Sequence, residues 1–325
     1  MKKVFKALLL IAAAFIVLAG LAAGYVAIFL PNVGKAPELK VERTPERIER
    51  GKYLATSVAV CVDCHSTRDW SQFAGPMVSG TEGKGGDRFG KEMGFPGVFY
   101  ARNITPYSLS KWTDGEIFRA ITSGVDKDNK ALFPLMPYSH YGAVDQEDIY
   151  SIIAYLRSMP AITNDVPKSE ADFPVNLIMK TMPSKPAFTT KPKTEDSVAY
   201  GKYLVTMAGC VDCHSKESKG AVIAGTEYGG GREFALPGGI VRAPNLTVHS
   251  TGMGSMTREQ FIQRFKLYQD SSYRSPLLQP TDFNTPMPWM MYSRMTESDL
   301  ASIYKFLQTV QPIDNRVQKF TPRKS

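Results

Sequence analysis

The pentapeptide Cys-Val-Asp-Cys-His occurs twice, at residues 61–65 and 210–214, and the two copies use all four cysteines of the 325-residue chain. Cys-x-x-Cys-His is the attachment signature of c-type haem. Two thiols on one helical turn can form thioethers to the vinyl groups of one porphyrin, and the next residue can then bind the iron. The sequence therefore predicts two covalently bound haem c groups. The predicted thioether cysteines and proximal histidines are Cys61, Cys64 and His65 in the first copy and Cys210, Cys213 and His214 in the second.

Paired cysteines also occur in zinc sites, redox pairs and disulfides. The compact four-thiolate zinc pattern separates its pairs by about 15–20 residues, whereas 149 positions separate Cys61 from Cys210. A thioredoxin-like pair needs a strand–helix–strand context, which neither copy has. Disulfides form outside the cytoplasm, but a disulfide would leave the repeated histidine unexplained. Haem attachment accounts for both the cysteines and the histidine.

The similarity between the two halves extends beyond the pentapeptides, in the same order along the chain. The matching segments are GKYL at 51–54 and 201–204, GTE at 80–82 and 225–227, Asn-[Ile/Leu]-Thr at 103–105 and 245–247, and Met-Pro-aromatic at 136–138 and 287–289. This pattern predicts that one structural domain was duplicated.

Each half is predicted to be helical, with long loops. Thr44 is a plausible N-cap because Pro45 follows it at the first helical position. The last segments, roughly 145–158 and 296–309, have apolar residues at helical spacing. The middles are rich in Gly and Pro, and no segment alternates convincingly enough to predict a sheet. We therefore expect an all-α fold.

The expected organisation has five parts: an N-terminal membrane anchor or uncleaved signal over 1–34, a first domain over 44–160, a proline-rich linker over 161–195, a second domain over 196–312, and a C-terminal tail over 313–325.

An uncharged stretch of 24 residues, 7–30, follows Lys2, Lys3 and Lys6. A membrane-spanning helix needs about 20 apolar residues, whereas the apolar region of a cleaved signal peptide has about 7–15. A cleavable signal ending at the Leu-Ala-Ala-Gly of 21–24 stays an alternative. The length favours a single-pass anchor in a bacterial inner membrane, with the lysines in the cytoplasm and the soluble domains in the periplasm.

The net charge of +8 includes those three lysines, and the other basic residues are scattered among acidic ones. This distribution argues against a nucleic-acid partner. A partly basic face for an acidic protein partner remains open.

The sixth iron ligand would separate an electron carrier from an enzyme. Met136 and Met287 occupy equivalent places in the two halves, and each precedes a proline and an aromatic residue. A methionine thioether raises the reduction potential of a haem, so we predict both as axial ligands. A methionine can also simply fill a core, and Met182-Pro183 is a similar pair without a repeat partner. The spare histidines His140 and His249 stand at non-equivalent positions, so neither is expected to bind iron.

Several residues near these motifs are candidates for supporting the haems. Asn103 and Asn245 repeat within loops, where each could hydrogen-bond near a haem or form an Asx turn. Arg102 and Arg242 could neutralise propionates. Tyr138 and Trp289 follow the Met-Pro pairs.

Taken together, these motifs resemble the class I cytochrome c modules of membrane-anchored multihaem cytochromes. The similarity is closest to the cytochrome subunits of periplasmic alcohol, aldehyde and gluconate dehydrogenases, and it covers about residues 45–310. Those subunits usually have three such domains, whereas this chain has two motifs. The resemblance implies two tandem all-α domains in which the Gly-Lys-Tyr-Leu helix crosses the last helix. Gly51 would then lie near Tyr155, and Gly201 near Phe306.

The expected function is single-electron transfer without substrate chemistry. The donor would be a dehydrogenase or quinol oxidiser, and the acceptor a terminal oxidase or a soluble cytochrome. The alternative is a peroxidase-like dihaem enzyme with one open iron. Two equivalent methionine segments argue against that alternative.

Overall fold

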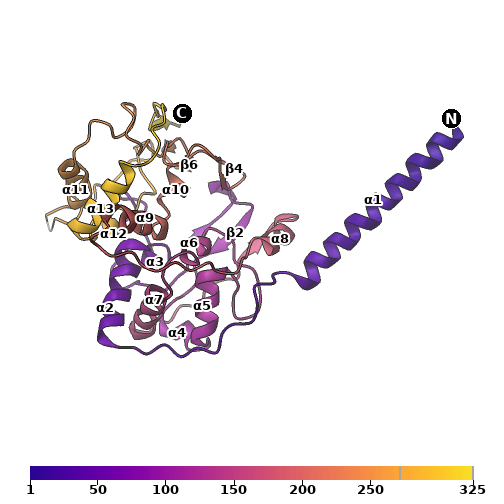
Figure 1. Cartoon of the computed structure of the whole chain (residues 1–325), viewed down its shortest axis with the longest axis horizontal. Coiled ribbons are helices and arrows are strands. Elements are labelled where there is room, and N and C mark those ends of the chain that lie inside the picture. Colours follow the sequence, from indigo (N-terminus) through magenta and orange to yellow (C-terminus); the bar gives the residue numbers. More distant parts are fainter. Residues whose placement is uncertain (271, 324–325) are drawn as a thin grey trace.

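The structure is a computed structural model, and it describes residues 1–270 and 272–323. Helix α1 (Lys2–Phe29) projects away from the rest of the chain, which forms one compact body (Figure 1). None of its residues is buried. Within the described residues, α1 is the one helix long and apolar enough to cross a membrane.

The first repeat, residues 44–160, contains six α-helices, and the second repeat covers residues 196–312. Helix α2 (Pro45–Tyr53) begins after Thr44, whose side chain accepts a hydrogen bond from the amide of Arg47, so the predicted cap is confirmed. Helix α2 continues as a π-helical turn, η1 (Leu54–Val58). The remaining helices are α3 (Cys61–Cys64), α4 (Pro106–Leu109), α5 (Asp114–Ser123), α6 (Tyr138–Tyr141) and α7 (Gln146–Ser158).

The second repeat has the same helices except for a counterpart of α4. They are α9 (Ser197–Met207), α10 (Cys210–Cys213), α11 (Arg258–Lys266), α12 (Trp289–Tyr292) and α13 (Glu297–Leu307) among the described residues. Helices α5 and α11 both begin with a capping box, at Thr113 and Thr257. The shared capping chemistry agrees with the repeat seen in the sequence.

A glycine allows the first and last helices of each repeat to cross closely. A Cβ atom on Gly51 would lie 1.8 Å from the carbonyl oxygen of Ser151 and 2.9 Å from the Cβ of Tyr155. A Cβ on Gly201 would lie 2.0 Å from the oxygen of Ser302 and 3.0 Å from the Cβ of Phe306. Both expected crossings are therefore present.

The structure also contains small antiparallel sheets, which the sequence analysis did not predict. Strands β1 (Arg88–Phe89), β2 (Gly97–Tyr100) and β3 (Glu170–Ala171) form one sheet, and β6 (Glu233–Leu236), β7 (Gly239–Arg242) and β8 (Phe320–Pro322) form another. Strands β4 (Glu217–Ser218) and β5 (Ala221–Val222) pair as a hairpin. The expectation of an all-α chain was wrong because these strands have two to four residues each, too few to show an alternating pattern.

Strands β3 and β8 play equivalent parts in the two large sheets. Each comes from the segment that follows the last helix of a repeat and adds a third strand to the hairpin of that repeat. The segment between the repeats also holds helix α8 (Val175–Ile178) and the short 3-10 turn η3 (Met179–Thr181). A further 3-10 turn, η2 (Lys91–Met93), lies between β1 and β2.

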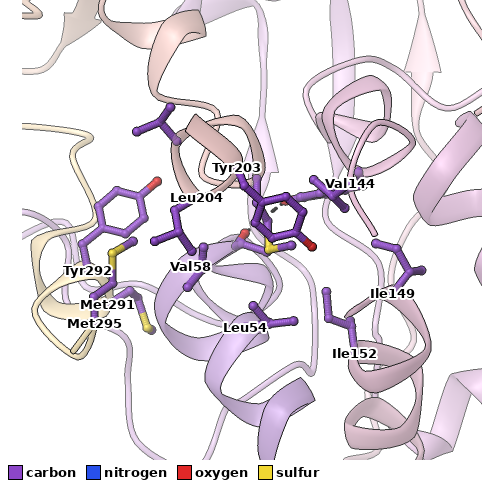
Figure 2. Packing of buried hydrophobic residues seen from close by; sticks show 14 of the residues in the cluster. Leu54, Val58, Val144, Ile149, Ile152, Tyr203, Leu204, Met291, Tyr292 and Met295 are labelled. Carbon is purple, nitrogen blue, oxygen red and sulfur yellow. Dashed lines mark hydrogen bonds between the residues drawn. The ribbon is translucent and has the colours of Figure 1, made fainter. Parts of the chain in front are cut away.

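The hydrophobic core runs without interruption from one repeat into the other. Figure 2 shows Leu54 and Val58 of the first repeat beside Leu204, Met291 and Met295 of the second. All five side chains are at most 2% exposed. The two repeats therefore share one core instead of being held together only by the segment between them.

Reciprocal hydrogen bonds reinforce this shared core. Tyr53 donates its hydroxyl to Asp299 of the second repeat and accepts from the amide of Thr296, the N-cap of α13. Tyr203, at the equivalent position, donates to Asp148 of the first repeat at 2.7 Å and accepts from the amide of Asp145, the N-cap of α7, at 3.2 Å. Each repeat thus contributes a tyrosine that binds the start of the other repeat's last helix.

Candidate haem sites

The two Cys-x-x-Cys-His motifs have the same local structure. Helices α3 and α10 each form one turn, and the amides of His65 and His214 donate to the carbonyls of Cys61 and Cys210 at 3.1 and 3.0 Å. A left-handed residue precedes each turn: Val60 with φ 46° and Gly209 with φ 63°. All four cysteines are free thiols. In both repeats the two cysteines and the histidine therefore lie on one turn.

A backbone carbonyl fixes the tautomer of each histidine. The Nδ1 atom of His65 lies 2.6 Å from the carbonyl oxygen of Arg102, and that of His214 lies 2.9 Å from the oxygen of Pro244. A carbonyl can only accept, so Nδ1 carries the proton and Nε2 keeps its lone pair. Burial also lowers the pKa of both histidines. A neutral ring with a free Nε2 is the form that binds a metal.

The thiols lie in surroundings that fit covalent attachment of an apolar ring. Cys64 and Cys213 are exposed on the surface, yet the surrounding protein raises the pKa of Cys64 to about 12 and also raises that of Cys213. Desolvation raises the pKa of Cys61 and Cys210 to about 12 as well. On each turn both thiols also lie beside a histidine whose Nε2 is free. The residues present therefore fit a haem at each motif.

The zinc alternative finds no support in the geometry. No group of three or more His, Cys, Asp or Glu side chains within residues 1–270 and 272–323 is arranged to hold a metal ion. Thiols with raised pKa values are also poor thiolate donors.

The segments that carry Met136 and Met287 share one backbone geometry. Pro137 and Pro288 have nearly the same angles, φ −78° with ψ 57° and φ −79° with ψ 63°. The amide two residues after each methionine donates to the methionine carbonyl at 2.8 Å, and both methionines are half-buried against the core. The two segments are therefore built alike, as the repeat predicted. The axial role of the two thioethers stays a prediction.

A tyrosine ties each methionine segment to the attachment turn of its own repeat. Tyr141 donates its hydroxyl to the carbonyl of Ala59 at 3.0 Å, and Tyr292 donates to the carbonyl of Ala208 at 2.9 Å. Ala59 and Ala208 each lie two residues before the first cysteine of a motif. Met182, the similar Met-Pro pair, lies outside both repeats and is exposed.

The aromatic residues after the Met-Pro pairs pack against other parts of their own repeats. Tyr138 is 3% exposed and covers Gly124 at the end of α5, where a Cβ atom would lie 2.5 Å from its ring. Trp289 stacks on Tyr268 with ring centroids 5.0 Å apart, and the guanidinium of Arg264 lies 4.9 Å from its ring. Both residues hold the methionine segment against the helix α5 or α11 of its own repeat.

Asn103 and Asn245 are buried and organise the backbone. Each side-chain oxygen accepts from the amide and hydroxyl of the threonine two residues later, so both form an Asx turn. Each side-chain amide donates at 2.8 Å to a carbonyl of the segment after the last helix, that of Ile162 or Ile313. The Asx-turn alternative thus describes the geometry of both residues.

Arg102 and Arg242 occupy non-equivalent positions in the two repeats. Arg102 serves His65 through its main-chain carbonyl, while its side chain pairs with Asp126 at 2.8 Å. Arg242 lies on β7 and pairs with Glu233 at 2.8 Å. The residue equivalent to Arg102 is Pro244, which likewise binds a histidine through its carbonyl. The sequence analysis missed both carbonyls, and their signal is the position just before the repeated asparagine.

The spare histidines make polar contacts with side chains. The Nε2 atom of His140 lies 2.8 Å from Asp212 of the other repeat. His249 contacts Thr251 at 2.9 Å.

The attachment turn of the second repeat lies at the junction of the repeats, where His140 of the first repeat hydrogen-bonds Asp212. Burial is the main cause of the raised pKa of Cys64, and the charge of Cys213 in the other repeat adds a smaller contribution. Tyr141 of the first repeat interacts electrostatically with Asp212, and Tyr292 of the second with Asp63. Each tyrosine thus lies near the attachment turn of the opposite repeat, so the two sites are neighbours.

Comparison with known proteins agrees with this geometry. Residues 198–311 match the cytochrome c family. The chain is 25% identical over 286 residues to the alcohol dehydrogenase (quinone) cytochrome c subunit of Gluconacetobacter polyoxogenes, covering 82% of this chain and 56% of that protein. It is 26% identical over 285 residues to the fructose dehydrogenase cytochrome subunit of Gluconobacter japonicus, covering 81% and 52%. The gluconate 2-dehydrogenase cytochrome c subunit of Pantoea cypripedii is 30% identical over 53% of this chain and 38% of its own length.

These similarities confirm the resemblance to multihaem cytochrome c subunits. The second repeat matches the cytochrome c family, and the relatives are named as cytochrome subunits of alcohol, fructose and gluconate dehydrogenases. The chain spans about half the length of the first relatives it matches.

Proposed function

We propose that this chain is a membrane-anchored dihaem cytochrome c that passes single electrons from a dehydrogenase or quinol oxidiser to an acceptor such as a terminal oxidase or a soluble cytochrome. The observation that carries the proposal is the pair of equivalent histidines, each beside two accessible thiols and each held with Nε2 free by a backbone carbonyl. Bound haem would supply a one-electron Fe(III)/Fe(II) couple.

The chain's own residues would attach, orient and shield the two groups. Cys61, Cys64, Cys210 and Cys213 would form the thioethers, with His65 and His214 as proximal ligands. The carbonyls of Arg102 and Pro244 keep each ring in the tautomer that can bind iron and fix its orientation. Both sites are built alike, so we expect both haems to be held in the same way.

Met136 and Met287 would complete the two iron sites. Their segments share backbone geometry and are tied by Tyr141 and Tyr292 to the residues just before the cysteines. A thioether at each site would raise the reduction potential and leave no open position for a substrate. The peroxidase-like alternative needs two sites of different construction, and nothing in these segments favours it.

The neighbouring position of the two sites suits transfer between them. The shared core and the reciprocal tyrosine bonds would hold the two repeats, proposed here as two tandem cytochrome c domains, in one relative orientation. A fixed orientation keeps the distance between the two groups constant, which is what a protein contributes to cofactor chemistry.

Helix α1 would anchor this body to the inner membrane, with the two repeats in the periplasm. Its 28 residues would extend about 42 Å at 1.5 Å per residue, which matches a bilayer of about 40–45 Å including headgroups. The relatives' names include dehydrogenases, so the donor proposed for this chain is a dehydrogenase of that kind or a quinol oxidiser.

Haem counting by mass spectrometry tests the proposal. We expect the purified wild-type chain to carry two covalent haems. The double variant Cys210→Ala/Cys213→Ala should carry one, and so should the matched variant Cys61→Ala/Cys64→Ala. An unmodified wild-type chain from a host that attaches haem c, or a double variant with both haems still bound, would contradict the proposal.

A further inference from the structure

An exposed apolar segment lies beside the C-terminal end of α1. This segment, residues 172–182, contains α8 and η3, and both contact α1. The ammonium of Lys180 donates to the carbonyl of Ala27 at 2.8 Å. A cation is favourable there because the last carbonyls of a helix carry partial negative charge. Figure 1 shows α8 on the side of the body that faces α1.

Three apolar side chains of this segment point into solvent. Phe173 is 79% exposed, Ile178 is 47% exposed and Met182 is 39% exposed. Single exposed apolar residues are common on proteins, but a group of them in one short segment marks a surface that another apolar phase covers.

The position of α1 in a membrane would set the depth of this segment relative to the bilayer. Tyr25 and Phe29 stack near the end of the helix, with ring centroids 5.3 Å apart. Aromatic residues at the end of a spanning helix mark the boundary between hydrocarbon and headgroups. Ala27, which Lys180 contacts, lies between them. The exposed side chains of the segment are therefore next to that boundary.

The connection between α1 and the body is not a free tether. The amide of Val41 donates to Asp114 at 2.8 Å, and Val41 is buried. The carbonyl of Pro37 would lie 1.8 Å from a Cβ atom on Gly115 of α5. Part of the chain between α1 and α2 thus packs against α5, which keeps the connection to α1 close to the body.

We infer that residues 172–182 form a second membrane contact, in which Phe173, Ile178 and Met182 enter the lipid headgroup region beside α1. The occupant of this surface is the bilayer itself. Lys180 and the exposed Lys185 suit anionic headgroups. The contact would fix the tilt of the two repeats above the membrane. This inference rests on the proposed anchoring by α1.

Spin labels test the inference in the full-length protein with both haems attached. Haem attachment consumes the native thiols, so the introduced cysteine is the one that reacts. The variants are Phe173→Cys and Met182→Cys in the segment, with Leu277→Cys as a matched control that is 76% exposed in the loop between α11 and α12. The protein is placed in phosphatidylethanolamine–phosphatidylglycerol vesicles. Collision rates with oxygen, which enters lipid, and with a water-soluble nickel chelate are then compared.

We expect the oxygen-to-nickel ratio at Phe173→Cys and Met182→Cys to exceed that at Leu277→Cys severalfold, because an interfacial side chain sits about 5–10 Å into the headgroup boundary. Equal ratios at all three positions would overturn the inference.

A label at Leu18→Cys in the middle of α1 separates this failure from failure of the anchor. A high ratio at Leu18→Cys, with water-like ratios in the segment, would reject only the second contact. A water-like ratio at Leu18→Cys would reject the anchor and the second contact together.

Discussion

At the scale of single residues, two tyrosines connect the repeats. Tyr203 donates to the buried carboxylate of Asp148 and accepts from the N-cap amide of α7. Hydrogen bonds to charged groups contribute about 1.5–3 kcal/mol to stability when buried. We expect Tyr203→Phe to lower the free energy of unfolding by about this amount, as measured by denaturant titration.

A matched control for that measurement is Tyr107→Phe. Tyr107 also donates to a carboxylate, that of Asp165 at 3.1 Å, but this bond lies at the surface. Its loss should cost less than the loss of the Tyr203 bond, because water competes for an exposed hydrogen bond to a carboxylate. Equal losses in the two variants would mean that the hydrogen bond between the repeats contributes no more to the free energy of unfolding than an exposed one.

Asp148 should make the stability depend on pH. Burial alone raises its pKa, but hydrogen bonds and charge from Arg50, with help from Tyr203 and Lys191, lower the pKa below its ordinary value. The folded pKa is then below the unfolded value of about 3.9. The stabilisation is therefore complete at neutral pH and is lost as pH falls below about 5 toward the folded pKa.

We expect the free energy of unfolding to fall more steeply with acid in the wild-type chain than in Asp148→Asn. The comparison is a series of denaturant titrations between neutral pH and about pH 3. Parallel curves for the two proteins would show that Asp148 is not a source of the pH dependence.

Sequence reasoning at this scale is most specific where covalent chemistry dictates residue types, and the haem-binding roles of these residues stay predictions. The cysteines and histidines follow from the spacing that thioethers and an axial ligand require. The sequence analysis missed the carbonyls that hold His65 and His214, because a main-chain oxygen carries no residue identity and only its position before the repeated asparagine marks it. The Tyr203–Asp148 bond depends on how two repeats pack, which neither repeat encodes alone.

At the scale of elements, the repeats differ by one residue in the stretch before the first cysteine, and a local change of helix type accommodates the difference. Eight positions separate Tyr53 from Cys61, but seven separate Tyr203 from Cys210. The extra residue is accommodated in the π-helical turn η1, where the amide of Ala59 donates to the carbonyl of Leu54. The equivalent stretch of α9 is a regular α-helix.

Deleting Ser57 should therefore convert η1 to a regular α-helical turn. The variant should still fold and attach two haems, because the result has the length that α9 already has. The control is deletion of Met207, which removes a buried residue from a regular helix and rotates what precedes it by about 100°. Haem content and far-ultraviolet circular dichroism report both outcomes. Loss of haem in the Ser57 deletion alone would contradict this interpretation.

The helices were predictable, whereas the sheets were not. Helix caps such as Thr44 and the apolar spacing of the last helices carry local signals. The strands are short, and β3 and β8 depend on segments that return from beyond the last helix. Such pairing is a tertiary effect, so local patterns in the Gly-rich and Pro-rich loops predicted only loops.

At the scale of the whole molecule, the shared core predicts cooperative unfolding. Side chains of η1, α7, α9 and α12 belong to one buried cluster (Figure 2). Separate unfolding of one repeat would expose the apolar face that the other repeat covers. We expect one transition in denaturant instead of two.

Tryptophan fluorescence can check this expectation. Trp289→Phe leaves the tryptophans of the first repeat, Trp70 and Trp112, and the double variant Trp70→Phe/Trp112→Phe leaves the one in the second. The two probes should give the same midpoint. Midpoints that differ would show that the repeats unfold independently.

The most direct test of the proposed function is low-temperature electron paramagnetic resonance of the purified ferric protein, integrated against its haem content. If Met136 and Met287 fill both sixth positions, two low-spin signals of histidine–methionine character should account for two irons per chain. A high-spin signal, or one that changes when peroxide or cyanide is added, would mean an open iron and would contradict a pure electron carrier.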